Sequence, residues 1–261
     1  MEATSKAILH WNEMGRTRQW SALYSDHIDS RNVHVVTRKL RTLQMLASEK
    51  PGAMLDIGCG PGILVKEVLE MGYRFAGMDL ADEMLKEGRE RWGENDRISF
   101  RVGDVEKIPA PDGSFEALTC LGVVEYLQDF PAAIREMKRV LKPGGVAIVS
   151  NHNRVHVDAV ALKIIAPLRL LALPLVRQVK KSKPDDLKRL LLQPKEFDAC
   201  MQAEGFELDG FAYYHYTPMS YPFHVLMPNL SYRFNRMFES FYRQRGMGFF
   251  AHGYIGKYRK G

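Results

Sequence analysis

The sequence of 261 residues predicts an α/β protein with a doubly wound, largely parallel sheet. Two observations predict it. Between residues 51 and 150, short apolar runs alternate with amphipathic helical runs, and a glycine-rich turn follows the first apolar run. Apolar residues make up 46% of the chain and charged residues 26%, a balance that excludes a disordered or collagen-like chain.

The predicted elements follow one another in a regular order. Two helices come first, at 5–25 and 33–49, and Pro51-Gly52 breaks the second. The five strands and the three crossover helices that follow are expected at 53–57, 74–79, 98–102, 115–121 and 145–150, and at 62–71, 82–92 and 131–141. Such crossovers place helices on both faces of a sheet.

The alternation stops after Ser150. A helix is predicted at 194–204, ended by Gly205, and further strands at 206–216 and 248–260 bring the sheet to seven strands. Residues 151–193 and 217–247 fit neither pattern and are expected to be insertions.

Positive charge is concentrated in the second half of the chain. Lys and Arg exceed Asp and Glu by 37 to 31 overall, and residues 151–261 hold 17 of the basic residues against 9 acidic ones. The mainly aliphatic run 159–176 is interrupted by two basic residues and two prolines, so it does not predict a membrane-spanning helix. Its composition fits an interfacial element on an anionic membrane, a lid over an apolar substrate, or an insertion whose lysines are merely solvated.

The glycine-rich turn LDIGCGPG at 55–62 joins the first strand to a helix. Its spacing is G-x-G-x-G, whereas a dinucleotide turn reads G-x-G-x-x-G. Asp56 precedes the first glycine, where it would repel a pyrophosphate and attract an ammonium group.

Asp79 and Asp104 follow the second and third strands. The carboxyl ends of parallel strands form one crevice, so we expect these acids and Asp56 to converge on one small molecule. Asp79 could accept both hydroxyls of a ribose, while Asp104 and the N–H of Val105 could frame a purine. Each acid could instead only cap a helix.

Four segments in the order expected for one family carry a resemblance: LDIGCGPG, GMDLADEML, GDVEKIPAPDGSFEALTC and LKPGGVAIVS. Over residues 50–150 the sequence resembles the class I S-adenosylmethionine (SAM) dependent methyltransferases, in the branch of the ubiquinone and menaquinone biosynthetic enzymes. The resemblance implies a seven-stranded Rossmann-like sheet with helical acceptor-binding insertions in a single domain, 1–261. Within it, 1–50 would form N-terminal helices or a lid, 51–150 the SAM-binding core, and 151–193 and 217–247 the insertions.

The resemblance also implies cofactor-binding positions. The glycines would lie along the methionine part of SAM, Asp79 would hold the ribose, and Asp104 and Val105 would frame the adenine. The Leu121 carbonyl would contact the amino group. The complete set is Asp56, Gly58, Gly60, Gly62, Asp79, Leu80, Asp104, Val105, Leu121 and Tyr24. Tyr24, beside Trp20, is the candidate aromatic lid, although both could simply anchor the first helix.

Methyl transfer to a hydroxyl or carbon acceptor can require a base, because the nucleophile must lose a proton. The candidates are His152, His215 and Tyr126, with Glu125 as an outsider. Tyr126 stands where many relatives carry histidine, and it could instead pack under the cofactor. His152 and His156 are four residues apart, but no third ligand stands near, so no metal is expected.

The predicted function is methyl transfer from SAM to a small, hydrophobic acceptor such as a natural product, a quinone-like or a lipid-like molecule. Aromatic residues between 211 and 247 could wall such an acceptor. An RNA methyltransferase and a catalytically silent SAM-binding partner are the alternatives. Nucleic acid is not expected, because the basic residues are interleaved with aliphatic ones and no RNA-binding module is visible. The three cysteines and the polar start of the sequence favour the cytoplasm, with contact to an anionic membrane surface as a further expectation.

Overall fold

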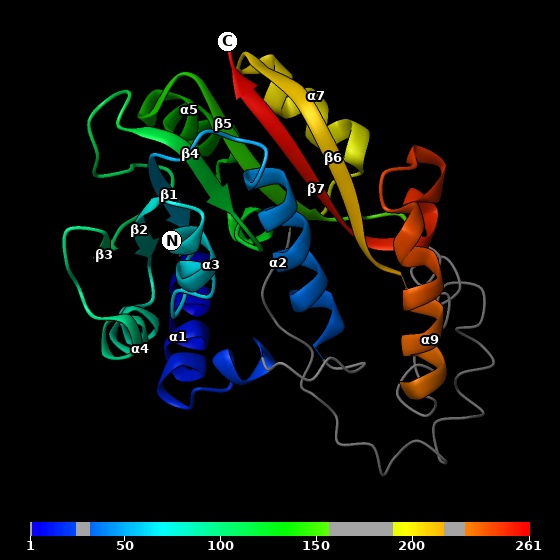
Figure 1. The fold of residues 1–261 in the computed structure, drawn as a ribbon, viewed down its shortest axis with the longest axis horizontal. Coiled ribbons are helices and arrows are strands. Elements are labelled where there is room, and N and C mark those ends of the chain that lie inside the picture. Colours follow the sequence, from blue (N-terminus) through cyan, green and yellow to red (C-terminus); the bar gives the residue numbers. More distant parts are fainter. Residues whose placement is uncertain (1, 25–31, 157–189, 217–227) are drawn as a thin grey trace.

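The strands form one seven-stranded sheet. A computed structural model describes residues 2–24, 32–156, 190–216 and 228–261, and its strand order is β3-β2-β1-β4-β5-β7-β6 (Figure 1). The strands are β1 (Ala53–Ile57), β2 (Arg74–Asp79), β3 (Ile98–Val102), β4 (Phe115–Cys120), β5 (Leu141–His152), β6 (Phe206–Tyr216) and β7 (Ala251–Lys260). The prediction of a seven-stranded α/β sheet is confirmed.

Strands β1 to β5 run parallel, and β7 is antiparallel to both of its neighbours, β5 and β6. The register places Asp79 beside Val102 and Ile57 beside both Met78 and Cys120. The carboxyl ends of the five parallel strands therefore lie along one edge of the sheet, as the sequence predicted.

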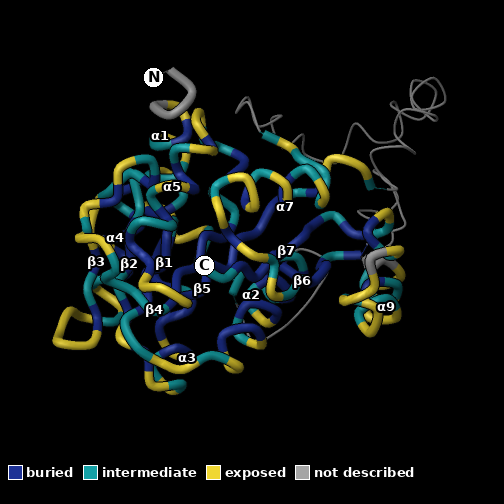
Figure 2. Tube along the Cα trace, turned by 90° about the horizontal axis from the view of Figure 1, so that it is seen from above, coloured by how far each residue is buried: buried dark blue, intermediate teal, exposed yellow. Residues whose placement is uncertain are grey.

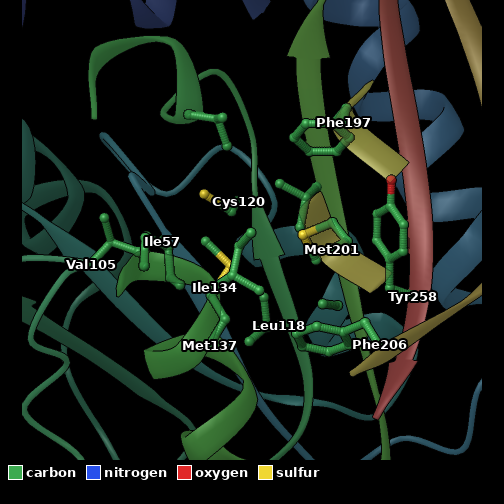
Figure 3. Close-up of a cluster of buried hydrophobic side chains, with 14 of the residues drawn as sticks. Ile57, Val105, Leu118, Cys120, Ile134, Met137, Phe197, Met201, Phe206 and Tyr258 are labelled. Carbon is green, nitrogen blue, oxygen red and sulfur yellow. The ribbon is translucent and has the colours of Figure 1, made fainter. Parts of the chain in front are cut away.

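Helices cover both faces of this sheet (Figures 1 and 2). They are α1 (Glu2–Arg16), α2 (Val33–Leu46), α3 (Val65–Glu70), α4 (Asp82–Trp92), α5 (Phe130–Val140), α7 (Pro194–Ala203) and α9 (Pro228–Phe238). Consecutive β1 side chains point to opposite faces: Met54 packs with residues of α2, α3 and α4, and Leu55 with residues of α5 and α7. Figure 3 shows the second cluster, with Ile134 and Met137 of α5 close to Leu118 of β4.

Several predicted elements have different bounds in the structure: the helix expected at 33–49 ends at Leu46, and the strand expected at 145–150 spans Leu141–His152. The bounds of two other helices are set by left-handed residues. The first, expected at 5–25, ends at Arg16, because Arg18 takes a φ of +53° that a right-handed helix cannot accommodate; a separate 3₁₀ turn, Ser21–Tyr24, follows. The helix expected from residue 62 begins at Val65, because Gly62 has a φ of +73°. Each boundary is set by one residue with a positive φ, and the local sequence pattern does not show which residue adopts that value.

The ends of the predicted insertions are described, and their middle parts are not. Residues 157–189, which include the basic aliphatic run, and 217–227 lie outside the described residues. α9 belongs to the insertion expected at 217–247, and it is anchored because the Asn235 side chain accepts a 2.7 Å hydrogen bond from the Tyr216 backbone N–H. Within the described ranges, no helix has the length and apolarity needed to cross a membrane.

A buried carboxylate joins α7 to β7. Asp198 Oδ1 accepts hydrogen bonds of 2.7 Å from both the Tyr254 and the Tyr258 hydroxyls. All three residues are buried, so neither hydroxyl could replace this acceptor with bulk water if the carboxylate were removed.

We expect Asp198→Ala to lower the free energy of unfolding by about 3 kcal/mol, because it removes the carboxylate that accepts from two buried hydroxyls. Asp198→Asn retains an acceptor oxygen and should cost less. Urea denaturation followed by circular dichroism measures both losses, with the exposed Asp96→Ala as control. Equal stability of Asp198→Ala and wild type would contradict this account.

Candidate functional site

A cavity of about 690 Å³ lies along the carboxyl edge of the parallel strands. Its volume falls in the range of roughly 300–1,000 Å³ that is usual for small-molecule sites. Residues from the ends of β1, β2 and β5, from the loops after β3 and β4, and from α1 and α2 line it. Those used below are Trp11, Trp20, His34, Arg38, Gly58, Gly60, Asp79, Leu80, Asp104, Val105, Leu121, Gly122, Glu125, Tyr126 and His152.

The glycine-rich turn forms the floor of this cavity. The N–H groups of Gly58 and Cys59 both donate to the Met78 carbonyl, at 2.7 and 3.1 Å, which fixes the turn against β2. Gly58 has a φ of +68°, and a Cβ there would come within 2.1 Å of Val123 Cγ2, so the position requires glycine. Gly58 and Gly60 line the cavity, whereas a Cβ at Gly62 would meet Val65, Phe100 and Trp92 in the packed interior.

Asp79 joins the turn to the next helix. Its Oδ2 accepts a 2.9 Å hydrogen bond from the Gly60 N–H, and its Oδ1 accepts one of the same length from Ala81, the N-cap residue of α4. Burial raises the pKa of Asp79, against the lowering effect of these backbone donors. Each carboxylate oxygen can accept a second hydrogen bond, so Asp79 caps the turn and can still bind a ligand in the cavity.

Asp56 lies beneath the turn and not in the cavity wall. Its Oδ1 accepts a 2.5 Å hydrogen bond from the Thr119 hydroxyl. Burial raises the pKa of Asp56 to about 7, although the hydrogen bond from Thr119 opposes that rise. The carboxyl group is therefore only partly ionised at neutral pH, and its attraction for an ammonium group is weaker than that of an ordinary aspartate.

Asp104 and Val105 line the end of the cavity at β3. Asp104 Oδ1 accepts a 3.0 Å hydrogen bond from the Glu106 N–H and so closes its own turn. Leu80 and Leu121 lie in the wall between this end and β5.

Aromatic rings from α1 and the following turn lie over the cavity. Trp11 packs edge-on against Trp20, with 5.1 Å between ring centroids, and against Tyr126 at 6.0 Å. Tyr24 packs against Trp20 at 5.9 Å and does not line the cavity, whereas Trp11 and Trp20 do, and the lid role suggested for Tyr24 stays a prediction. Trp11 was not predicted, because its partners are distant in sequence.

Arg38 is a functional candidate that the sequence analysis missed. It lies on α2, is 6% exposed, and faces Gly122, where a Cβ would come within 2.5 Å of Arg38 Nη1. Burial lowers the pKa of Arg38, but Tyr24, Tyr214 and Glu125 outweigh that effect and leave the pKa above its usual value. The cavity wall therefore contains a permanent positive charge. One feature of the sequence could have indicated Arg38: it follows the apolar Val35 by three residues, which is the spacing of one face of a helix, and that face of α2 is buried.

Of the predicted bases, His152 and Tyr126 line the cavity and His215 does not. Nε2 of His152 lies 3.4 Å from Glu125 Oε1. The ring of His215 packs against His34, which does line the cavity, with 5.5 Å between centroids. Burial and the nearby Arg38 lower the pKa of His34 to about 4. Among the residues that the structure describes, no group of three or more histidines, cysteines or acids could hold a metal ion.

Comparisons with known proteins give the chain a family. Residues 55–149 match the model of a methyltransferase domain. A ubiquinone biosynthesis O-methyltransferase of Xanthomonas axonopodis pv. citri is 32% identical over 173 residues, which are 65% of this chain and 69% of that protein. This chain belongs to the class I SAM-dependent methyltransferases, in their ubiquinone-like branch.

Other matches to this chain are shorter or more distant. The protein of the same name from Xanthomonas oryzae pv. oryzae is 39% identical over 103 residues, so the match spans 39% of the chain and 43% of that relative. A malonyl-[acyl-carrier protein] O-methyltransferase of Serratia marcescens is 36% identical over 110 residues, 42% of each chain. The crystal structure of magnesium protoporphyrin IX methyltransferase from Synechocystis, with bound SAH, shares the fold at a TM-score of 0.64 and 15% identity, covering 99% of this chain and 100% of that one.

The positions that the family resemblance implied divide into two groups in the structure. Most line the cavity: Gly58, Gly60, Asp79, Leu80, Asp104, Val105 and Leu121. Asp56, Gly62 and Tyr24 lie behind its wall, so any effect that they have on a ligand is transmitted through their neighbours.

The lowered pKa of His34 predicts acid sensitivity. In the unfolded chain His34 takes up a proton as the pH falls below about 6.5, whereas in the folded protein it does so only near 4, so stability is lost between these values. The ring is partly exposed, so we expect His34→Gln to reduce the loss of unfolding free energy between pH 7 and pH 4.5 by about 2 kcal/mol. Urea denaturation at both pH values measures it, with the exposed His10→Gln as control. An equal acid loss in wild type and His34→Gln would refute the assignment.

Proposed function

We propose that this chain transfers a methyl group from SAM to a small-molecule acceptor. The observation that carries the proposal is the cavity that runs along the ends of five parallel strands, with Asp79 held at its centre by the Gly60 N–H. The members of the family that match most of the chain are named methyltransferases, which supports the same activity.

The adenosine part of SAM fits the half of the cavity at β3 and β2. Asp79 retains accepting capacity on both oxygens and would take the two ribose hydroxyls. Leu80 and Val105 offer apolar surface for the adenine, and Asp104 would accept from its amino group. The ribose hydroxyls and the adenine amino group donate hydrogen bonds, and Asp79 and Asp104, at the ends of neighbouring strands, would accept them.

The amino-acid part of SAM fits the next section of the cavity. Gly58 and Gly60 have no side chains, so the backbone of the turn can approach the ligand closely. Arg38 supplies a buried positive charge that would pair with the carboxylate, and the carbonyl of Leu121 would accept from the ammonium group. The carboxylate and the ammonium group of this zwitterion would thus each meet a group of complementary charge or polarity in the cavity wall.

The chemistry requires little more than positioning. SAM supplies a methyl group already activated by its sulfonium centre, and the protein must hold an acceptor in line with it. The rings of Trp11 and Trp20 exclude water from the covered side of the cavity. Exclusion of water strengthens the hydrogen bonds and ion pairs that orient both reactants.

The acceptor end of the cavity combines apolar and polar groups. Leu121 and Tyr126 lie there with Glu125, His34 and His152. We infer that the acceptor presents a polar group to this end of the cavity. The matched relatives from Xanthomonas and Serratia are both named O-methyltransferases, which supports oxygen as the methylated atom.

The ribose assignment is tested on Asp79. Asp79→Asn replaces an oxygen acceptor with an amide donor that opposes the ribose hydroxyls, so we expect affinity for S-adenosylhomocysteine to fall about 10- to 100-fold, or 1–3 kcal/mol. Isothermal titration calorimetry measures the change, and Asp96→Asn, an exposed carboxylate outside the cavity wall, is the matched control. Unchanged affinity in a folded Asp79→Asn variant would remove Asp79 from the site.

The carboxylate assignment is tested with a truncated ligand. 5′-Methylthioadenosine lacks the amino-acid group, so Arg38→Met should weaken S-adenosylhomocysteine at least tenfold and leave 5′-methylthioadenosine nearly unchanged. Equal weakening of both ligands would indicate that Arg38 acts only on the shape of the cavity.

Turnover separates the remaining alternatives. Purified protein is incubated with methyl-labelled SAM and one of three preparations: a small-molecule extract, an intact RNA fraction, or the same RNA fraction after nuclease treatment. Label in a small molecule supports the proposal. Label only in intact RNA favours an RNA methyltransferase, and tight binding of S-adenosylhomocysteine without transfer to either favours a catalytically silent partner.

A further inference from the structure

One end of the cavity has no role in binding SAM as assigned above. Adenosine takes the ends of β3 and β2, and the amino-acid part takes the β1 turn with Arg38. The section between the end of β4 and the end of β5 remains, and its polar residues include Glu125, His34 and His152. Because it adjoins the methionine section, it is the part of the wall that an acceptor would contact.

Glu125 and His152 are held in this section by regular structure. Glu125 lies in the 3₁₀ turn Val124–Tyr126, is 2% exposed, and its backbone carbonyl accepts a 2.7 Å hydrogen bond from the Leu190 N–H. His152 is the last residue of β5 and is paired in register with Gly253 of β7. The contact of 3.4 Å between Glu125 Oε1 and His152 Nε2 therefore joins two well-anchored residues.

We propose that Glu125 and His152 form an acid–base pair that deprotonates the acceptor, which makes the acceptor class an un-ionised hydroxyl such as a phenol or an enol. The inference rests on the proposed function. Glu125 is the positioning residue: it holds the proton of the neutral imidazole on Nε2 and places the basic lone pair on Nδ1. His152, whose side chain is 35% exposed, is the catalytic residue that receives the acceptor proton.

The step balances without another reactant. The acceptor O–H proton moves to His152, an oxygen–carbon bond forms to the methyl group, and the carbon–sulfur bond breaks with its electron pair remaining on sulfur. The products are a methyl ether, S-adenosylhomocysteine and an imidazolium whose charge the Glu125 carboxylate stabilises. Distances in a protein without its substrates are often longer than in the reacting complex, and 3.4 Å is compatible with this role.

The neighbouring groups favour His152 over the other cavity histidine. His34 lies beside Arg38 and His252, and a positive charge on His34 and one on His152 would oppose each other. Its ring packs against His215, so a positive charge on His34 would be opposed by Arg38 and any charged neighbouring imidazole. His152 has a carboxylate at its Nε2 instead, which stabilises the protonated state that a base must reach.

The decisive experiment compares two acceptors of different acidity. Catechol is un-ionised at neutral pH, whereas 4-nitrocatechol is largely ionised and needs no base. We expect His152→Ala to lower kcat/KM about 100- to 1,000-fold with catechol and less than tenfold with 4-nitrocatechol. Added imidazole should restore part of the catechol activity. Equal losses with the two acceptors, or transfer to octanoate but to neither catechol, would overturn the proposal.

Glu125 requires readouts that a structural role would not change. Glu125→Gln should lower kcat with catechol about tenfold at unchanged KM and move the acidic limb of the pH profile, while Glu125→Asp should recover part of the activity. The exposed Glu207→Gln on β6 is the matched control. Nuclear magnetic resonance of labelled histidine, with S-adenosylhomocysteine bound, should show His152 titrating about one pH unit lower in Glu125→Gln than in wild type.

That titration does not depend on the choice of acceptor, and an identical midpoint in both proteins would overturn the pairing. The two proposals can fail separately. If His152→Ala and Glu125→Gln bind S-adenosylhomocysteine as wild type does, the cofactor assignment stands whatever the acceptor data show. If wild type itself fails to bind S-adenosylhomocysteine, the proposed function is wrong, and the pair loses its basis.

Discussion

The double hydrogen bond to Asp79 is the interaction on which the site depends. One carboxylate oxygen fixes the N–H of Gly60 in the β1 turn, and the other fixes the N–H of Ala81 at the start of α4. α1 in turn rests on α4, where the Asn12 side chain accepts from the Glu83 N–H and Gly15 allows the backbones to meet. The Asp79 side chain therefore fixes the position of the floor of the cavity and, through α4, the position of the helix that carries Trp11.

Buried charge is the second organising feature of the cavity. Arg38, Asp56 and Glu125 are all nearly inaccessible to solvent, and each lies near a group that offsets its burial: Glu125 and Arg38 act on one another, while Asp56 accepts from Thr119 and is partly protonated. Arg38 and Glu125 line the cavity, whereas Asp56 lies behind its wall, and all three groups are already desolvated before a ligand arrives. The free-energy cost of burying these groups arises when the protein folds, so ligand binding does not add it again.

The sequence predicted the parts of the protein that local patterns determine. Strands 53–57, 74–79 and 98–102 and helix 82–92 agree with the structure residue for residue, because β-strand runs and helix periods are short-range signals. Most of the cofactor positions implied by the motifs also line the cavity. Trp11, Arg38 and the contact between Glu125 and His152 depend on segments that meet only in the folded chain, and no local pattern marks such meetings. The boundaries near Arg18 and Gly62 were missed for a different reason, since each is set by one left-handed φ value.

The place of β7 has a consequence for how the protein acquires its structure. Among the seven strands of the described sheet it is the last in sequence, yet it lies between β5 and β6 and pairs with both. During synthesis on the ribosome, β5 and β6 must therefore wait with unpaired edges until residues 251–260 have emerged. Unpaired edges of this kind are where nascent chains associate wrongly. β7 therefore protects both edges at once when it inserts between β5 and β6.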